Sequence, residues 1–98
     1  MEEKIMTLII HSGEARSYSM EAIAAAKEGN LEEAKGLIEK ADVELGEAHN
    51  AQTSLIQAEA GGEKIEMSLL MVHAQDHFMT SMTLKDLAKE IIEIYGKL

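Results

Sequence analysis

Residues 31–60 read LEEAKGLIEKADVELGEAHNAQTSLIQAEA, and this stretch carries the clearest periodicity in the chain. Its apolar and small residues recur at alternating spacings of three and four, which is typical of helices in left-handed, coiled-coil-like bundles. We therefore predict one long helix here, with a single face packed against other helices. The positions on this face are Leu31, Ala34, Ile38, Ala41, Leu45, Ala48, Gln52 and Leu55.

Two glycine-containing breaks bound this helix. Gly29 and Asn30 precede it, as the C-terminal glycine of one helix and the N-cap asparagine of the next. Gly61 and Gly62 follow it, with a polar segment that ends at about Glu66. The chain therefore divides into helices of about 3–28, 31–60 and 67–95 in a single domain, residues 1–98. Short connections between long helices predict an all-α fold, an antiparallel up-down-up three-helix bundle.

The two flanking helices have different apolar patterns. Residues 69–72 of the third helix are all apolar, so this helix is apolar on several faces. Such a helix is buried on most sides, whereas a lone three-helix bundle leaves each helix one wet face. The surplus apolar surface of the third helix predicts a second interface, between copies of the chain in a dimer or a trimer. The packing face expected in the first helix is mostly small: Ile5, Leu8, Ser12, Ala15, Ser19, Ala22 and Ala26.

Charge and composition exclude several classes of function. The formal net charge of −9 argues against nucleic-acid binding, which needs a basic surface. Without cysteine the chain has no disulfide, no thiolate nucleophile and no cysteine metal ligand. No apolar run approaches the roughly 20 residues that span a bilayer. We therefore expect no membrane insertion and a cytoplasmic location.

The segment Val72–Phe78, VHAQDHF, holds three titratable groups in an otherwise apolar part of the third helix. Asp76 interrupts an apolar stripe, where an isolated carboxylate is costly unless it is protonated, paired or bound to a cation. His73 and His77 are four residues apart and therefore share a neighbouring face. The interrupted stripe consists of Leu69, Val72, Asp76, Met79 and Thr83.

The residues alone leave three interpretations of this cluster open. In the first, polar side chains of the other helices satisfy these groups inside the bundle. In the second, His73, Asp76 and His77 bind a metal, because two histidines at i and i+4 suit helical zinc sites. In the third, one histidine is a nucleophile, because neutral imidazole forms a labile phosphoramidate suited to carrying a phosphoryl group transiently.

The other polar residues of interest have less specific expected roles. Arg16, the only arginine, could guide an anion, but a surface salt bridge with Glu14 or with a neighbouring helix is favoured. His49 and Gln52 could support the third helix or form ordinary hydrogen bonds in the core. His11, close to an apolar run, is expected to be structural.

The run LLMVHAQDHFMTSM, residues 69–82, resembles the third helix of the enzyme IIA component of the lactose/cellobiose (N,N′-diacetylchitobiose) phosphotransferase system. The stretches LIIHSGEARS and EAHNAQTSLIQAEAGG agree with the same family in order and spacing, so the likeness covers nearly the whole chain. Lactose-type members have glycine at the position of Ala74. The resemblance therefore favours a β-linked disaccharide such as cellobiose or chitobiose over lactose.

The resemblance implies a concrete activity, that of a phosphotransferase component. Members of this family are homotrimers that form a nine-helix bundle with the third helix in the interior. They accept a phosphoryl group on a histidine from the carrier HPr and pass it to a cysteine of enzyme IIB, which serves the membrane component enzyme IIC. His73 matches the phosphorylated histidine. Beyond the resemblance, we expect Gln75 and His77 to support it by orienting the imidazole or by hydrogen-bonding the phosphoryl oxygens. Asp76 matches the aspartate that holds one divalent metal ion, expected to be structural Mg²⁺, on the trimer axis.

Two alternatives belong to different classes. Residues 25–34, AAKEGNLEEA, resemble the turn of a tetratricopeptide or microtubule-interacting hairpin, which would make the chain a non-enzymatic interaction module. No second repeat is visible, and a solenoid needs several. The other alternative is a helical metal-binding bundle that uses His73, Asp76 and His77.

Overall fold

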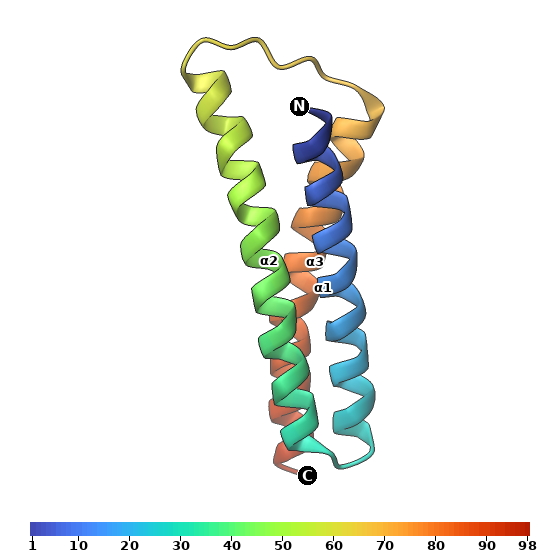
Figure 1. Ribbon diagram of the computed structural model, residues 1–98. Helices are drawn as coiled ribbons and strands as arrows, with labels where there is room; N and C mark the ends of the chain where they lie inside the picture. The colour runs from blue at the N-terminus through green and yellow to red at the C-terminus, as the bar shows by residue number, and fades with distance from the viewer.

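The computed structural model describes all 98 residues and contains three helices and no strand. Helix α1 spans Glu2–Lys27, α2 spans Leu31–Ala60 and α3 spans Leu69–Gly96. They alternate in direction along a rod of 52 × 21 × 17 Å, so the N-terminal ends of α1 and α3 lie at the same end (Figure 1). The predicted all-α, up-down-up architecture is confirmed. None of the helices combines the length and the apolar character that crossing a membrane requires.

The connection between α1 and α2 is a tight turn built on Gly29. Its φ of 83° lies in the left-handed region that favours glycine. The N–H of Gly29 donates to the carbonyl of Ala26, and the N–H of Asn30 donates to that of Ala25, which is the Schellman pattern. Asn30 is the N-cap residue of α2, as predicted, but its side chain makes no capping hydrogen bond. Only the Asn30 carbonyl joins the helix, by accepting from the N–H of Ala34.

Helix α3 begins with a side-chain cap that the sequence analysis missed. The hydroxyl of Ser68 accepts a hydrogen bond from the N–H of Met71 at 3.1 Å. Ser68 itself is extended, with φ −132° and ψ 164°, as an N-cap residue must be. The helix therefore starts at Leu69, whereas the sequence pattern placed its start at 67.

The core consists of the predicted faces of α1 and α2 together with one face of α3. Every position expected on the α1 face is buried, and its small residues let α1 pack closely against both neighbours. The pairing of α2 with α3 is the least extensive of the three. One apolar cluster contains Ile5, Leu8, Ala15, Ala41, Leu45, Ala48, Leu55, Met71, Ala74 and Phe78. A second contains Ala22, Ala25, Ala26, Ala34, Ile38, Ala88 and Ile92.

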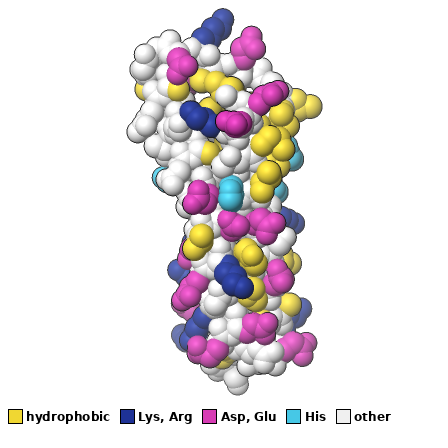
Figure 2. All heavy atoms as spheres, in the orientation of Figure 1, with side chains coloured by type: hydrophobic (Ala, Val, Ile, Leu, Met, Phe, Trp, Pro, Cys, Tyr) yellow, Lys and Arg dark blue, Asp and Glu magenta, His cyan; other side chains and the backbone are white.

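A second apolar face of α3 points away from this core. Leu69 is 86% exposed, and Val72 and Met79 are about half exposed. Asp76 and Thr83, the polar members of the same stripe, are also exposed, and Leu87 and Ile94 extend the apolar face toward the C-terminus. Figure 2 shows hydrophobic side chains gathered along one flank of the upper half of the molecule, while acidic side chains spread over the rest of this view. The surplus apolar surface expected for the third helix therefore exists outside the single-chain core.

Lys85 of α3 pairs with two carboxylates, and the one of Asp42 connects it to α2. Its Nζ lies 2.8 Å from Asp42 Oδ1 and 3.0 Å from Asp86 Oδ1, and its side chain is only 14% exposed. Burial by itself lowers the pKa of Lys85. The hydrogen bonds and negative charges of Asp42 and Asp86 outweigh that effect and raise the pKa above its ordinary value of 10.5.

This bridge predicts a pH-dependent loss of stability. A raised pKa in the folded state means that the bridge stabilises the protein fully below pH 10.5 and that this contribution is lost as the pH rises through the folded-state pKa. Wild type should therefore have a higher Tm than Lys85→Gln at neutral pH, and the difference should shrink above pH 10.5. Thermal unfolding across this pH range measures it. Lys35→Gln, which removes an exposed 3.8 Å pair with Glu32, is the control and should show no such difference.

Candidate functional site

Helix α3 places the imidazoles of His73 and His77 one turn apart on a shared face, as their spacing predicts. The two rings are nearly parallel, with 9° between their planes and 5.6 Å between their centroids. His73 is exposed and His77 is half-buried. No side chain of the chain hydrogen-bonds to either imidazole. The first interpretation, in which other helices satisfy these rings, is therefore not what the structure shows.

His77 reaches the backbone of α1 at Gly13, a residue that the sequence analysis did not single out. A Cβ atom placed on Gly13 would lie 3.4 Å from Nε2 of His77. The ring of His77 therefore lies between α1 on one side and His73 on the other. A glycine within the LIIHSGEARS stretch was the only sign in the sequence of a close approach here. Which residue approaches it depends on how α1 and α3 are rotated about their axes.

Gln75 is held by α2 and not by the histidines. Its Oε1 accepts a hydrogen bond from Nε2 of Gln52 at 2.8 Å, and its own amide nitrogen lies 3.8 Å from the sulfur of Met71. Gln52 therefore supports α3, which is one of the two roles expected of it. Gln75 makes no hydrogen bond to His73 or His77 within the chain, so its supporting role in the chemistry stays a prediction.

Asp76 lies on the exposed apolar stripe, which neighbours the face of the histidine pair. Its carboxylate makes no salt bridge within the chain. No three histidine or acidic side chains of one chain are grouped to hold a metal ion, so the site proposed from His73, Asp76 and His77 is not formed. The geometric reason is that adjacent residues on a helix point about 100° apart, which separates Asp76 from His77. A metal bound by Asp76 would need ligands from other molecules.

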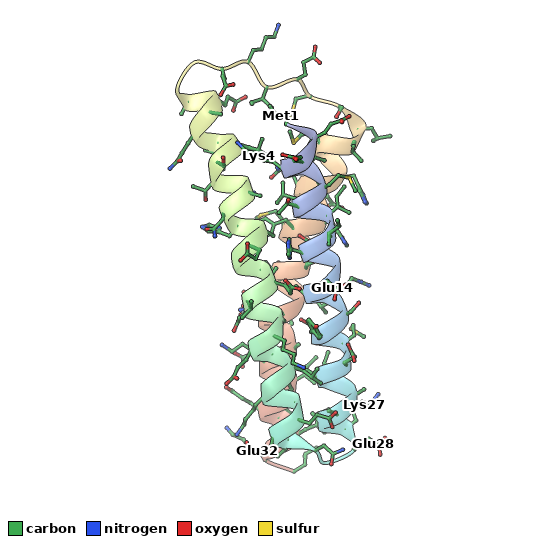
Figure 3. All side chains as sticks on the ribbon, in the orientation of Figure 1. Met1, Lys4, Glu14, Lys27, Glu28 and Glu32 are labelled. Atoms are coloured by element: carbon green, nitrogen blue, oxygen red, sulfur yellow. The ribbon has the colours of Figure 1, made fainter.

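The remaining polar candidates have structural or unassigned positions. His11 Nδ1 lies 2.8 Å from Glu44 Oε2 and joins α1 to α2, which is the structural role expected of it. His49 is exposed, and its ring lies 6.3 Å from that of the buried Phe78. Glu14 lies midway along α1 (Figure 3), but Arg16 is exposed and makes no salt bridge with it or with any other residue. The predicted Arg16 ion pair was therefore wrong.

The sequence of residues 3–96 matches the family described as "PTS system, Lactose/Cellobiose specific IIA subunit". The chain belongs to this family. It is 60% identical to the lichenan-specific phosphotransferase enzyme IIA component of Bacillus subtilis over 98 residues, which are all of this chain and 89% of that protein. The resemblance expected from the sequence is thereby confirmed, and the chain is a phosphotransferase component.

Solved structures of enzyme IIA proteins have the same fold. The cellobiose-specific enzyme IIA of Bacillus anthracis superposes with a TM-score of 0.96 at 50% identity, covering 98% of this chain and 88% of that one. The chitobiose enzyme IIA of Escherichia coli, solved in complex with HPr, gives a TM-score of 0.84 at 46% identity, covering 98% and 93%. The Gly29–Asn30 hairpin is thus part of an enzyme IIA bundle and does not indicate a tetratricopeptide-like module.

Proposed function

We propose that this enzyme IIA carries a phosphoryl group on His73, receiving it from phospho-HPr and passing it to a cysteine of its cognate enzyme IIB. The observation that carries the assignment is the position of His73, which is exposed on α3 with an imidazole free of hydrogen bonds. A partner protein can therefore approach this ring directly. The complex of the related Escherichia coli protein with HPr supports HPr as the donor.

The transfer exchanges one N–P bond for another. The lone pair of the unprotonated ring nitrogen of His73 attacks phosphorus in line, while the N–P bond of the donor phosphohistidine breaks and its electron pair returns to that imidazole. Each ring keeps the proton on its other nitrogen, so no proton is released. In the second step the thiolate sulfur of enzyme IIB attacks, an S–P bond forms and His73 regains its lone pair. Such loose transition states depend mainly on positioning, to which the parallel ring of His77 contributes.

The proposed sugar is a β-linked disaccharide of the cellobiose or chitobiose type. The relatives named above are specific for lichenan, cellobiose and chitobiose, which supports this class. Ala74, where lactose-type proteins have glycine, is fully buried beside the histidine pair and agrees with the same class. The chain itself serves as a cytoplasmic carrier, and enzymes IIB and IIC act on the sugar.

Phosphorylation in a reconstituted system tests this function. The protein is incubated with phosphoenolpyruvate, enzyme I and HPr, and then with enzyme IIB proteins of cellobiose, chitobiose and lactose type. We expect one acid-labile phosphoryl group per chain in the mass spectrum, followed by faster transfer to a cellobiose- or chitobiose-type IIB than to a lactose-type IIB. Absence of the first phosphoryl group would rule out the carrier function, and preferred transfer to the lactose type would rule out the sugar class.

We further propose that three copies assemble around the exposed stripe of α3. Half-exposed Val72 and Met79 flank Asp76 on this stripe, and burying such apolar surface is favourable. Three copies would bring three Asp76 carboxylates together, an oxygen ligand set of the kind that Mg²⁺ prefers. The role of the ion would be to neutralise these charges inside the assembly, with no part in phosphoryl transfer. One ion per trimer is the expected stoichiometry.

An Asp76→Leu variant should keep the trimer and make it more stable. Replacing buried charges by apolar side chains of similar size commonly gains about 1–4 kcal/mol. Analytical ultracentrifugation at decreasing protein concentration measures dissociation, and metal analysis should show that the ion is lost. Met79→Glu, which adds a carboxylate one turn away, is the contrasting variant and should dissociate. Monomers for Asp76→Leu would contradict the axial position of this residue.

A further inference from the structure

Gly13 occupies a position in α1 where a glycine is unfavourable unless space is needed. It lies in the middle of a 26-residue helix, and glycine is among the least helix-stabilising residues. A Cβ atom at this position would lie 3.4 Å from Nε2 of His77, with a side-chain ring as its nearest neighbour. Gly13 therefore gives the His77 ring direct access to the α1 backbone.

Two other helical glycines in the chain lack such a neighbour. A Cβ atom at Gly36 or at Gly46 of α2 would meet nothing within 4 Å. An alanine therefore fits at both positions without touching another side chain. Gly13 differs from them because the ring of His77, a candidate functional residue, lies next to the space that a side chain at residue 13 would occupy. Substitutions at Gly36 and Gly46 can therefore serve as controls.

The position of His77 is connected to that of His73. The two imidazoles are parallel within 9°, and their centroid distance of 5.6 Å lies in the range over which aromatic rings interact. His73 is exposed and has no side-chain hydrogen bond, and the parallel ring of His77 is a contact that can fix its plane. His77, in turn, is half-buried between His73 and the α1 backbone.

We propose that Gly13 is a positioning residue for phosphoryl transfer, because it provides the space in which His77 lies and His77 in turn orients the ring of His73. This rests on the proposed function, in which His73 carries the phosphoryl group. A methyl group at residue 13 would reach van der Waals contact with Nε2 of His77 at 3.4 Å, and the larger, branched side chain of valine would extend past that contact and displace the ring. The ring plane of His73 would follow, and the attacking nitrogen would leave the line of transfer.

Phosphoryl transfer from phospho-HPr, measured by rapid quench at several HPr concentrations, tests the proposal. We expect Gly13→Val to lower kcat by about tenfold or more, toward the ~100-fold that a misplacement of 1 Å can cost, and Gly13→Ala, whose methyl group only reaches contact distance, to lower it less. The KM for HPr should stay the same, because the docking surface is intact. Gly36→Ala and Gly46→Ala should keep the wild-type kcat. All three alanine variants should unfold at or above the wild-type Tm, which separates a positioning effect from loss of folding.

A double variant shows whether Gly13 acts through His77. In a His77→Ala background the ring is absent, so adding Gly13→Val should cause no further loss of kcat. The proposal is overturned if Gly13→Val transfers as fast as Gly36→Val, or if its cost in kcat is the same with and without His77.

Nuclear magnetic resonance of the histidine rings gives a readout that does not depend on activity. Gly13→Ala should shift the ring signals of His77 and His73 and leave those of His11 unchanged, whereas Gly36→Ala should shift none of them. Unshifted His77 signals in Gly13→Ala would overturn the proposal even if the protein were not a phosphocarrier. Failure of the proposed function would appear separately, as phosphorylation that persists in a His73→Gln variant.

Discussion

A His73→Gln protein is expected to fold like the wild type and to accept no phosphoryl group from phospho-HPr. The glutamine amide has no nucleophilic nitrogen, so the N–P bond cannot form. The side chain of His73 is exposed and makes no hydrogen bond, so its replacement should change the free energy of unfolding by no more than about 0.5 kcal/mol. Mass spectrometry after incubation with phosphoenolpyruvate, enzyme I and HPr measures the phosphoryl group, and circular dichroism measures the fold.

His11→Gln is the matched control for this result. It removes another histidine and breaks the 2.8 Å contact with Glu44, at a cost of about 1 kcal/mol in stability. It should still gain one phosphoryl group per chain. Normal acid-labile labelling of His73→Gln would contradict the assignment, and labelling that disappears only in His77→Gln would move it to the second histidine.

The largest expected effect on stability is that of Phe78→Ala. Phe78 is the only phenylalanine, it is 1% exposed, and it lies in the apolar cluster that contains residues of all three helices. Truncating a buried phenylalanine to alanine costs about 3–5 kcal/mol, because apolar contacts are lost and a cavity remains. A small domain has only about 5–15 kcal/mol of stability, so the variant should be close to unfolding. Urea unfolding at a fixed protein concentration measures the change.

Val43→Ala is the control for the core substitution. Val43 lies on α2 with 67% of its surface exposed, so its truncation should change the free energy of unfolding by less than about 0.5 kcal/mol. If Phe78→Ala cost no more than Val43→Ala, the position of Phe78 at the centre of the bundle would be wrong.

The helices and their buried faces could be predicted because a heptad pattern depends only on residue spacing. All the α1 positions predicted on the packing face, from Ile5 to Ala26, are buried, and so are most of those predicted for α2. The ends were less predictable, because a cap depends on local backbone conformation. Ser68 and Asn30 both occupy N-cap positions, but only the side chain of Ser68 makes a capping hydrogen bond.

For the candidate functional residues too, features within one helix could be predicted from the sequence, whereas contacts between helices could not. The shared face of His73 and His77, and the exposed stripe that contains Asp76, follow from positions within one helix. The Gln52–Gln75 hydrogen bond and the contact between Gly13 and His77 join different helices. Their formation depends on how each helix is rotated about its axis, and no spacing within one segment specifies that rotation.

The two glycine turns described above have a consequence for the chirality of the chain. Gly29, at φ 83°, and Gly62, at φ 100°, are the only residues with a positive φ. Every other residue has a negative φ, as is natural to L-amino acids, so each of the two connections places its left-handed conformation on an achiral residue. A D-amino acid prefers positive φ, and a chemically synthesised chain with D-alanine at either turn should therefore accept it where L-alanine is strained. The chain thus takes a left-handed conformation at two residues, and neither of them has a stereocentre.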